Sequence, residues 1–218
     1  MRLCIYCAGG LGREVLDVAH RVNKEFNRWE EIFFIDDEIE ENEICETKVY
    51  KFKDIIEKLD RSNTEFTIAN GEPAIREKLF NRLKEHKLKI ATIIAVDAII
   101  SPFVKIGEGV TIFSGAIISN NACLEKGVFL NFNCIVGHDV KIDEFTVVSP
   151  GSSIGGFTLI GRRSYIGLNA CIKDRIKIED NVIIGMGSVV FKDVSLSKIV
   201  IGNPAREIAI NDKHRVFK

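Results

Sequence analysis

The sequence lacks the features that mark membrane, secreted or nucleic-acid-binding proteins. Its apolar runs are a handful of residues long, too short to cross a bilayer. Lys and Arg number 30 and Asp and Glu number 31, so the net charge is -1 and no basic surface is expected for nucleic acid or an anionic membrane. Histidine is scarce, with four in 218 residues, so each is a candidate for a specific role.

The beginning of the chain gives no sign of export. Residues 1–7 run straight into glycines, without a longer apolar run or a small-residue cleavage site, so we expect a cytoplasmic protein. The six Cys are then expected to be reduced. Cys4 and Cys7 form a C-x-x-C pair, but they lie inside an apolar run instead of opening a helix. We interpret them as part of a buried strand, not as a redox or metal site.

The first 94 residues alternate between strand and helix signals. Short apolar runs read as buried strands, and apolar residues at helical spacing follow them. This alternation predicts an α/β domain over 1–94, a small parallel Rossmann-like sheet covered on both faces. The expected strands are 3–8, 32–35, 66–69 and 90–94, and the expected helices are 15–26, 52–59 and 73–83.

The rest of the chain has a period of six. From Ile106 to Val190 every sixth residue is Ile, Leu or Val, over fifteen successive positions. A helix does not have this period, and an amphipathic strand has a period of two. A six-residue repeat fits a parallel β-helix with three short faces, so that eighteen residues make one coil. We therefore expect an all-β prism over 95–218, with the aliphatic residues pointing inward.

Several segments together resemble one enzyme family. They are Ala8–Val15 (AGGLGREV), Phe34–Asp37, Ile68–Gly71 with Ile75 and Arg76 beyond it, Leu130–Asp139, and Gly202–Arg206. In this order they resemble the bacterial hexapeptide-repeat sugar O- and N-acetyltransferases, which include sialic-acid O-acetyltransferase and the nucleotide 4-amino-sugar N-acetyltransferases. The resemblance implies a left-handed β-helix, acetyl-CoA as co-substrate, no metal, and a homotrimer with active sites between subunits.

His138 is the candidate general base. It is the only His between residues 87 and 213, and it comes two places after the inward Val136, so it is expected at an outward-facing corner of the coil. Imidazoles titrate near neutral pH, as a general base requires. Asp139 could fix the tautomer of the ring and stabilise its charged form. The alternative is a solvated surface pair without a catalytic role.

The resemblance implies further residues around the acyl group. Asn131 would position the acceptor, and backbone N–H groups near Gly155 and Gly156 would bind the developing oxyanion. Thr146 stands where several relatives carry a second His. Its hydroxyl could contact the acyl donor, although packing explains a small residue at this position equally well. The residues expected to line the pantetheine groove are Gly167, Leu168, Gly185 and Met186.

A second group of candidates lies at the ends of the predicted parallel strands. Glycines at the start of the first helix would let a phosphate approach backbone N–H groups, although their spacing is not G-x-G-x-x-G. Acidic and amide side chains follow the next two strands at the same edge of the sheet, which favours a nucleotide-sugar site. A tight turn and a solvated acidic loop are the alternative for the acidic pair. The candidates are Gly9, Gly10, Gly12, Asp36, Asp37, Asn70 and Gly71.

These observations predict an acyl-CoA-dependent transferase that acetylates the amine of a nucleotide-linked 4-amino sugar. An O-acetyltransferase acting on sialic acid or another sugar hydroxyl is the alternative in the same class. A hexapeptide-repeat zinc enzyme such as a carbonic anhydrase needs about three His ligands, and His138 is alone in the repeat. A non-catalytic scaffold would leave the glycine-rich segment and the His-Asp corner unexplained.

Overall fold

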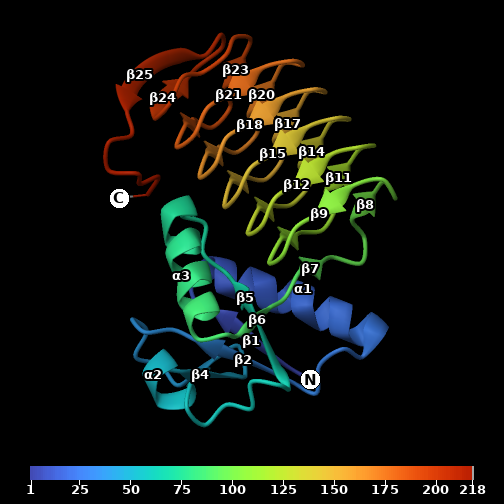
Figure 1. The fold of residues 1–218 in the computed structure, drawn as a ribbon, viewed down its shortest axis with the longest axis vertical. Helices are drawn as coiled ribbons and strands as arrows, with labels where there is room; N and C mark the ends of the chain where they lie inside the picture. The colour runs from blue at the N-terminus through green and yellow to red at the C-terminus, as the bar shows by residue number, and fades with distance from the viewer. Residues whose placement is uncertain (218) are drawn as a thin grey trace.

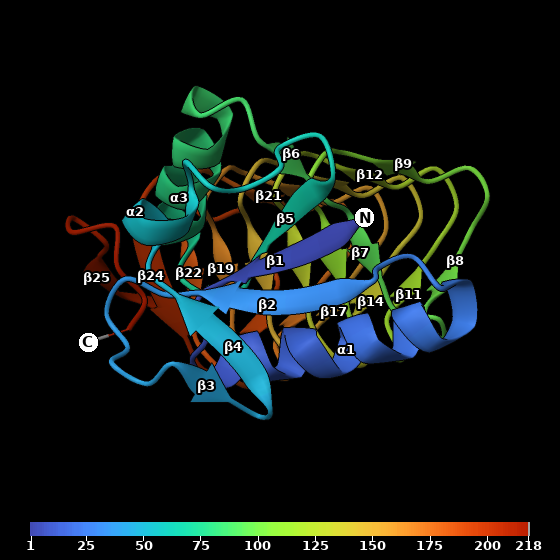
Figure 2. The ribbon, with the colours of Figure 1, turned by 90° about the horizontal axis from the view of Figure 1, so that it is seen from below.

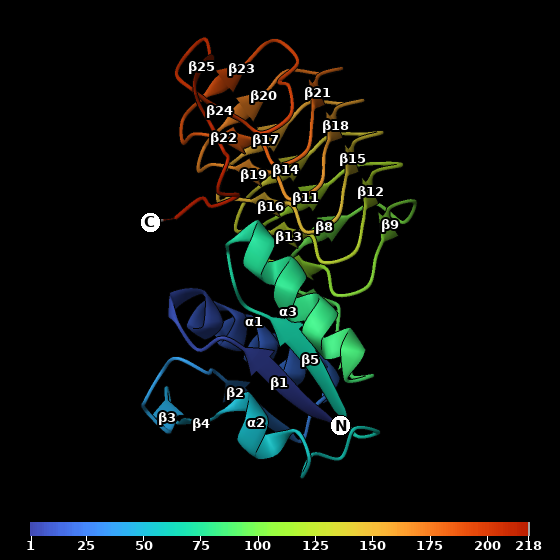
Figure 3. The same cartoon turned by 60° about the vertical axis from the view of Figure 1, so that its left-hand side comes forward.

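The computed structural model describes residues 1–217 and consists of two parts. Figure 1 shows an N-terminal α/β part below a ladder of short strands that climbs to the C-terminal end. The two parts meet along α1, which lies between the sheet and the ladder, and at the upper end of α3, which lies beside the ladder (Figure 3).

The N-terminal sheet has six strands in the order β3-β4-β2-β1-β5-β6, and all neighbours are parallel except β3 and β4. It confirms the predicted parallel sheet. Figure 2 shows α1 along one side of it and α2 and α3 on the other. The elements are β1 (Arg2–Tyr6), α1 (Gly10–Phe26), β2 (Glu31–Ile35), β3 (Glu43–Ile44), β4 (Thr47–Tyr50), α2 (Phe52–Ile55), β5 (Thr64–Ile68), α3 (Pro73–Glu85) and β6 (Lys89–Ile90).

Two details of this domain differ from the expectation. The β3–β4 hairpin was not expected, because its turn is made by Cys45 and Glu46, which adopt positive φ angles of 49° and 56° without a glycine to signal it. The expected strand over 90–94 is divided between β6, which ends the N-terminal sheet, and β7, which begins the prism. The chain therefore passes from one sheet to the other within three residues.

The prism is a parallel β-helix with eighteen residues per coil, as the repeat predicted. Strand partners are separated by that number, as in the pair Thr111 and Phe129. The first sheet contains β7 (Ile93–Ile94), β10 (Thr111–Ile112), β13 (Phe129–Leu130), β16 (Val147–Val148), β19 (Tyr165–Ile166), β22 (Ile183–Ile184), β24 (Lys198–Ile201) and the antiparallel β25 (Arg206–Ile210). The second contains β8 (Ile99–Ile100), β11 (Ile117–Ile118), β14 (Ile135–Val136), β17 (Ser153–Ile154), β20 (Cys171–Ile172) and β23 (Val189–Val190). The third contains β9 (Lys105–Ile106), β12 (Cys123–Leu124), β15 (Lys141–Ile142), β18 (Leu159–Ile160) and β21 (Lys177–Ile178).

The interior of the prism is the aliphatic column that the repeat identified. From Ile112 to Val190 the side chain at every sixth position is at most 4% exposed, and these side chains form one cluster. Burial of stacked aliphatic side chains supplies the main driving force for this part of the fold.

The three outer faces of the prism differ in chemistry. Outward side chains of the first sheet, such as Phe129 and Val147, are buried against the N-terminal domain. Those of the third sheet are mostly charged or polar. Those of the second sheet begin with Ile99, Ile117 and Ile135, which are 63%, 38% and 44% exposed. We call this second sheet the apolar face.

α3 fixes the N-terminal domain to the prism through a buried arginine. Arg76 is 1% exposed, and its guanidinium donates to the carbonyl oxygens of Ile68 and Asn70 after β5 and to that of Gly127 in the prism. Burial lowers the pKa of Arg76 to about 9. Because one side chain satisfies carbonyls of both domains, the end of β5 is held at a fixed position relative to the prism.

Candidate active site

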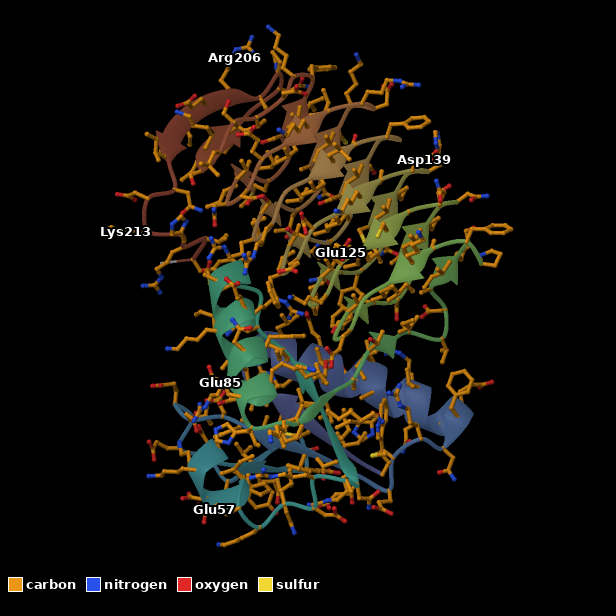
Figure 4. The ribbon with its side chains drawn as sticks, viewed as in Figure 1. Glu57, Glu85, Glu125, Asp139, Arg206 and Lys213 are labelled. Atoms are coloured by element: carbon orange, nitrogen blue, oxygen red, sulfur yellow. The ribbon has the colours of Figure 1, made fainter. Side chains whose placement is uncertain are left out.

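His138 lies at the corner that follows β14, between the apolar face and the third sheet. Val136 points inward and is fully buried, while the His138 side chain is 56% exposed. Figure 4 shows the neighbouring Asp139 at the outer edge of the prism. The imidazole is therefore on the surface of the single chain, where a substrate can reach it.

The ring of His138 is held by Asp139. Nδ1–H of His138 donates to Oδ2 of Asp139 at 2.8 Å, which leaves Nε2 as the nitrogen available for a proton. Asp139 is oriented in turn by Asn121, whose amide Nδ2 donates to its Oδ1 at 2.6 Å. Hydrogen bonds from Asn121 and His138 lower the pKa of Asp139, so the carboxylate is ionised at neutral pH. This chain of contacts fixes the tautomer that a general base needs.

The next coil supports the ring from the other side. An ideal Cβ built on Gly156 would lie 2.7 Å from Nε2 and 2.8 Å from Cε1 of His138, so the imidazole occupies the space that the missing side chain leaves. The ring of Phe157 meets the imidazole edge to face, with centroids 5.0 Å apart. The guanidinium of Arg175 lies 4.4 Å above Phe157. His138 is thus confined between Asp139 and the coil above it.

The two expected oxyanion glycines differ in what their amides do. The N–H of Gly155 donates to the carbonyl of Ile172 at 2.9 Å as part of the β-helix ladder. The N–H of Gly156 donates to no backbone carbonyl of the described residues. Of the expected pair, Gly156 is therefore the residue whose amide remains available to an oxyanion next to His138.

The structure corrects the expectation for Thr146. Its side chain is fully buried inside the prism, and its hydroxyl donates to the carbonyl of Gly161 at 2.8 Å and accepts from the N–H of Ser164. Packing and hydrogen bonding in the interior therefore account for this residue. Its hydroxyl does not face the surface where an acyl donor would bind.

The residues expected along the pantetheine groove lie at another corner. Leu168 and Met186 follow β19 and β22 at equivalent places in successive coils, and their side chains are 42% and 69% exposed. Asn131 follows β13 at the same corner, two coils earlier than Gly167. The apolar face separates this corner from His138. A single chain therefore does not bring the two groups together.

The N-terminal domain contains a cavity of about 630 Å³ at the carboxyl ends of β1, β2 and β5. Its walls include the expected Asp36, Asp37 and Asn70, with Arg82 from α3. The N-terminus of α1 starts at Gly10 beside this edge, and Gly9 and Gly10 are exposed. Backbone amides at a helix start favour an anion such as a phosphate.

Gly12 is a packing residue in this loop. It is buried, and a Cβ there would lie 2.2 Å from the carbonyl oxygen of Cys7. Only a glycine lets the first turn of α1 approach the end of β1 this closely. Gly12 thus shapes the loop, while Gly9 and Gly10 present the open surface.

The two adjacent aspartates have different partners. Both carboxylate oxygens of Asp36 accept backbone N–H groups, from Ala8 at 2.9 Å and from Glu38 and Ile39. Asp36 therefore orders the loops around the cavity. This agrees with the tight turn that the sequence offered as an alternative to a binding role. Asp37 accepts from the N–H of Phe52 and the guanidinium of Arg82. Burial opposes ionisation of Asp37, but these hydrogen bonds outweigh it and lower its pKa.

A second cavity of about 270 Å³ lies between the two domains. It is lined by Leu11 and Gly71 from the N-terminal domain, by Asn131 and Leu168 from the prism corner, and by Phe217 from the end of the chain. Asn70 borders the first cavity and Gly71 the second, so the loop after β5 lies between them.

The cysteines and the other potential metal ligands are distributed as follows in the described part of the chain. Residues 1–217 contain no cluster of three or more His, Cys, Asp and Glu side chains arranged for a metal. All six cysteines are free. Burial raises the pKa of Cys4, and it raises that of Cys7 to about 11, so neither is a reactive thiolate. No helix in residues 1–217 has both the length and the apolar character that a bilayer crossing needs.

Several residues of these sites carried no signal in the sequence. Asn121 contacts Asp139 from the preceding coil, and Phe157 contacts His138 from the following coil. The repeat places these coils side by side, but it does not single out which corner side chains meet. Arg82 is one of many charged residues on α3. Phe217 reaches its cavity only because the chain turns back after β25.

Comparison with known proteins agrees with this architecture. Residues 2–83 match the family model of the PglD N-terminal domain. The acetyltransferase domain of PglB from Neisseria gonorrhoeae, solved with acetyl coenzyme A, is 29% identical, with a TM-score of 0.90 over 95% of this chain and 98% of that one. WeeI from Acinetobacter baumannii is also 29% identical, with a TM-score of 0.89 over 95% of this chain and 100% of that one.

A more distant similarity confirms the fold alone. PerB from Caulobacter crescentus, solved with CoA and GDP-perosamine, is 22% identical, with a TM-score of 0.88 over 96% of this chain and 98% of that one. These matches confirm the α/β domain followed by a left-handed parallel β-helix that the sequence predicted. Residues 2–83 match the PglD N-terminal domain, and the chain as a whole shares its two-domain architecture with the PglB acetyltransferase domain and with WeeI.

Proposed function

We propose that the protein transfers an acetyl group from acetyl-CoA to the amine of a nucleotide-linked 4-amino sugar. The observation that carries this proposal is the imidazole of His138, which Asp139 holds at Nδ1 and whose Nε2 lies in the space left by the missing side chain of Gly156. The similarity to a PglB domain solved with acetyl coenzyme A supports the choice of acyl donor.

The reaction follows from these groups without a covalent enzyme intermediate. The nitrogen lone pair of the sugar amine attacks the thioester carbonyl, and Nε2 of His138 accepts the proton that the nitrogen loses. The N–H of Gly156 stabilises the negative oxygen of the tetrahedral intermediate. When the carbon–sulfur bond breaks, the proton passes to the CoA thiolate and the amide product remains. Asp139 stabilises the imidazolium that exists between the two proton transfers.

We propose that the active protein is a homotrimer whose sites lie between subunits. His138 and the groove corner with Leu168 lie on opposite edges of the apolar face, so one chain alone holds half of the site on each edge. The exposed isoleucines of the apolar face supply the apolar surface that such an interface buries. Packing this face against a neighbouring copy would bring the His138 corner of one subunit to the groove corner of the next.

We propose that the two domains divide the substrates between them. The nucleotide would occupy the cavity beside Asp37 and Arg82, with its phosphates at Gly9 and Gly10, within domain 1–94. The sugar would extend past Gly71 into the second cavity, toward the acyl groove of the prism in 95–218. The six free thiols fit a reducing compartment, so we place the reaction in the cytoplasm.

The proposed function is tested by a thermal-shift screen followed by a transfer assay. UDP-, GDP- and dTDP-linked 4-amino sugars, with free sialic acid as the contrasting acceptor, are added with and without acetyl-CoA. We expect stabilisation by one nucleotide amino sugar, and then CoA release together with an N-acetylated product by mass spectrometry. His138→Ala should lower kcat by roughly 10²–10⁴ with an unchanged melting temperature. Transfer to a sialic-acid hydroxyl, or an unaffected His138→Ala variant, would contradict the proposal.

A further inference from the structure

The C-terminal end of the chain folds back onto the N-terminal domain. We call residues 211–217 the C-terminal strap. Asn211 anchors its start, because its Nδ2 donates to the carbonyl of Asn181 at 2.9 Å and its backbone N–H donates to that of Ser197. In Figure 4 the label of Lys213 marks the strap, which runs toward the upper end of α3, on the side of the prism opposite Asp139.

A buried carboxylate fixes the far end of the strap. Glu72, the N-cap residue of α3, is 5% exposed. Its Oε1 and Oε2 accept the N–H of Val216 at 2.8 and 3.0 Å, and Oε2 also accepts the N–H of Phe217 at 3.1 Å. A buried carboxylate without partners would cost several kcal/mol, so these amides and Glu72 stabilise one another. The strap is therefore a held element of the fold.

This attachment places the Phe217 ring at the second cavity. The ring lies 3.6 Å from the position that a Cβ on Gly71 would occupy, and it meets Tyr165 edge to face with centroids 5.6 Å apart. It is nevertheless 52% exposed, because its remaining surface faces the cavity and solvent. An aromatic ring that is fixed at its backbone and open on one side is suited to stack against a ligand.

We propose that Phe217 forms the wall of the acceptor-sugar site and that Glu72 is the positioning residue that holds it there. This inference rests on the proposed function, since that function places the sugar in the cavity beside Gly71 and Asn131. The ring would pack against the C–H face of the sugar and limit how far it moves from the acyl groove. The C-terminal strap thus contributes to recognition of the acceptor sugar.

The experiment measures each substrate separately, using the nucleotide amino sugar that gives the largest shift in the thermal screen. Phe217→Ala should raise the KM of that sugar about five- to tenfold, the loss of one aromatic contact, with the KM of acetyl-CoA unchanged. Phe217→Tyr keeps the ring and should restore the wild-type KM. Phe26→Ala is the matched control. Phe26 is also an exposed phenylalanine, but it lies at the C-terminal end of α1, whereas the glycines Gly9 and Gly10 lie at the start of that helix.

Glu72→Gln tests the attachment. The glutamine side chain has only one acceptor oxygen, because an NH2 group replaces the second oxygen of Glu72. Hydrogen exchange at Val216 and Phe217 should therefore accelerate, and the KM of the sugar should rise as in Phe217→Ala. The double variant should be no worse than the more severe single variant. The proposal would be overturned if Glu72→Gln accelerated exchange at Val216 and Phe217 but left the KM of the sugar unchanged. Equal increases in the KM of the sugar and of acetyl-CoA would also overturn it.

Calorimetry separates this inference from the proposed function. If the wild-type chain binds the sugar nucleotide but transfers no acetyl group, the proposed function fails, and the Kd of Phe217→Ala still decides the role of the strap. A Kd equal to that of the wild type would overturn it. A wild-type chain that binds no sugar nucleotide would overturn both.

Discussion

Replacing Gly156 with alanine tests how closely catalysis depends on the position of the His138 ring. The new Cβ would lie 2.7 Å from Nε2 and 2.8 Å from Cε1, whereas ordinary contacts of this kind are about 3.5 Å or longer. The imidazole must therefore move by about 0.7 Å or more. Gly156 does not have a positive φ angle, so its backbone accepts an alanine without conformational strain.

The expected cost follows from this displacement. A misplacement of about 1 Å in a catalytic group costs roughly 10²-fold in rate, or about 2.7 kcal/mol of transition-state stabilisation. We expect kcat of Gly156→Ala to fall by about that factor, because Nε2 moves away from the amine while the N–H of residue 156 remains. The assay is CoA release at saturating substrates, with thermal unfolding as the check that the coil is intact.

A double variant identifies the cause of the loss. If Gly156→Ala acts by displacing His138, then adding it to His138→Ala should lower kcat no further, since the displaced group is already absent. Wild-type turnover in the single variant would show that the ring adapts freely and would refute the reasoning. An additional loss in the double variant would show that residue 156 acts on the acyl group independently of the imidazole.

Three further predictions concern the frame of the site. Asp37→Asn should lower the melting temperature at pH 7, and this effect should shrink as the pH falls below about 4 and through the depressed pKa of Asp37, because the carboxylate stabilises the fold only while it is charged and paired with Arg82; an effect that does not shrink as the pH falls would contradict this. Arg76→Ala should destabilise the protein by roughly 3 kcal/mol in urea unfolding, since it leaves buried carbonyls such as that of Gly127 without a donor, and a loss below about 0.5 kcal/mol would show that Arg76 does not hold the two domains together. Ile135→Asp should dissociate the trimer in sedimentation experiments and abolish transfer without unfolding the chain; a monomeric wild type or a trimeric variant would refute the shared site.

The sequence predicted those parts of the fold in which aliphatic side chains are buried at regular intervals along the chain. The aliphatic period of six is a direct consequence of side chains that fill a narrow prism, so Ile112 to Val190 could be assigned inward without a structure. The β3–β4 hairpin could not be predicted from the sequence. Its turn consists of Cys45 and Glu46 with positive φ angles, which glycine and asparagine usually adopt. Packing elsewhere in the domain decides such a turn, and local composition does not record it.

Within the candidate site, the residue that stands out by its type was predictable. The side chains that contact it from other coils were harder to predict. His138 was conspicuous as the single imidazole of the repeat, and its corner followed from Val136. The orientation of its ring depends on Asn121, which acts through Asp139, and on Phe157, and both belong to the neighbouring coils. Thr146 was ambiguous because small polar residues serve the interior and the surface equally well until their hydrogen bonds are known.

The uniform register of the coils has a consequence for how such a chain changes length. Each coil adds about 4.8 Å to the stack, the ordinary spacing of hydrogen-bonded strands. A duplication or deletion of eighteen residues would keep every residue on its face of the prism, whereas a length that is not a multiple of six would move aliphatic side chains out of the interior. Evolution or a protein engineer could therefore lengthen the groove for a longer acyl chain in whole steps, without redesigning the corner that carries the imidazole.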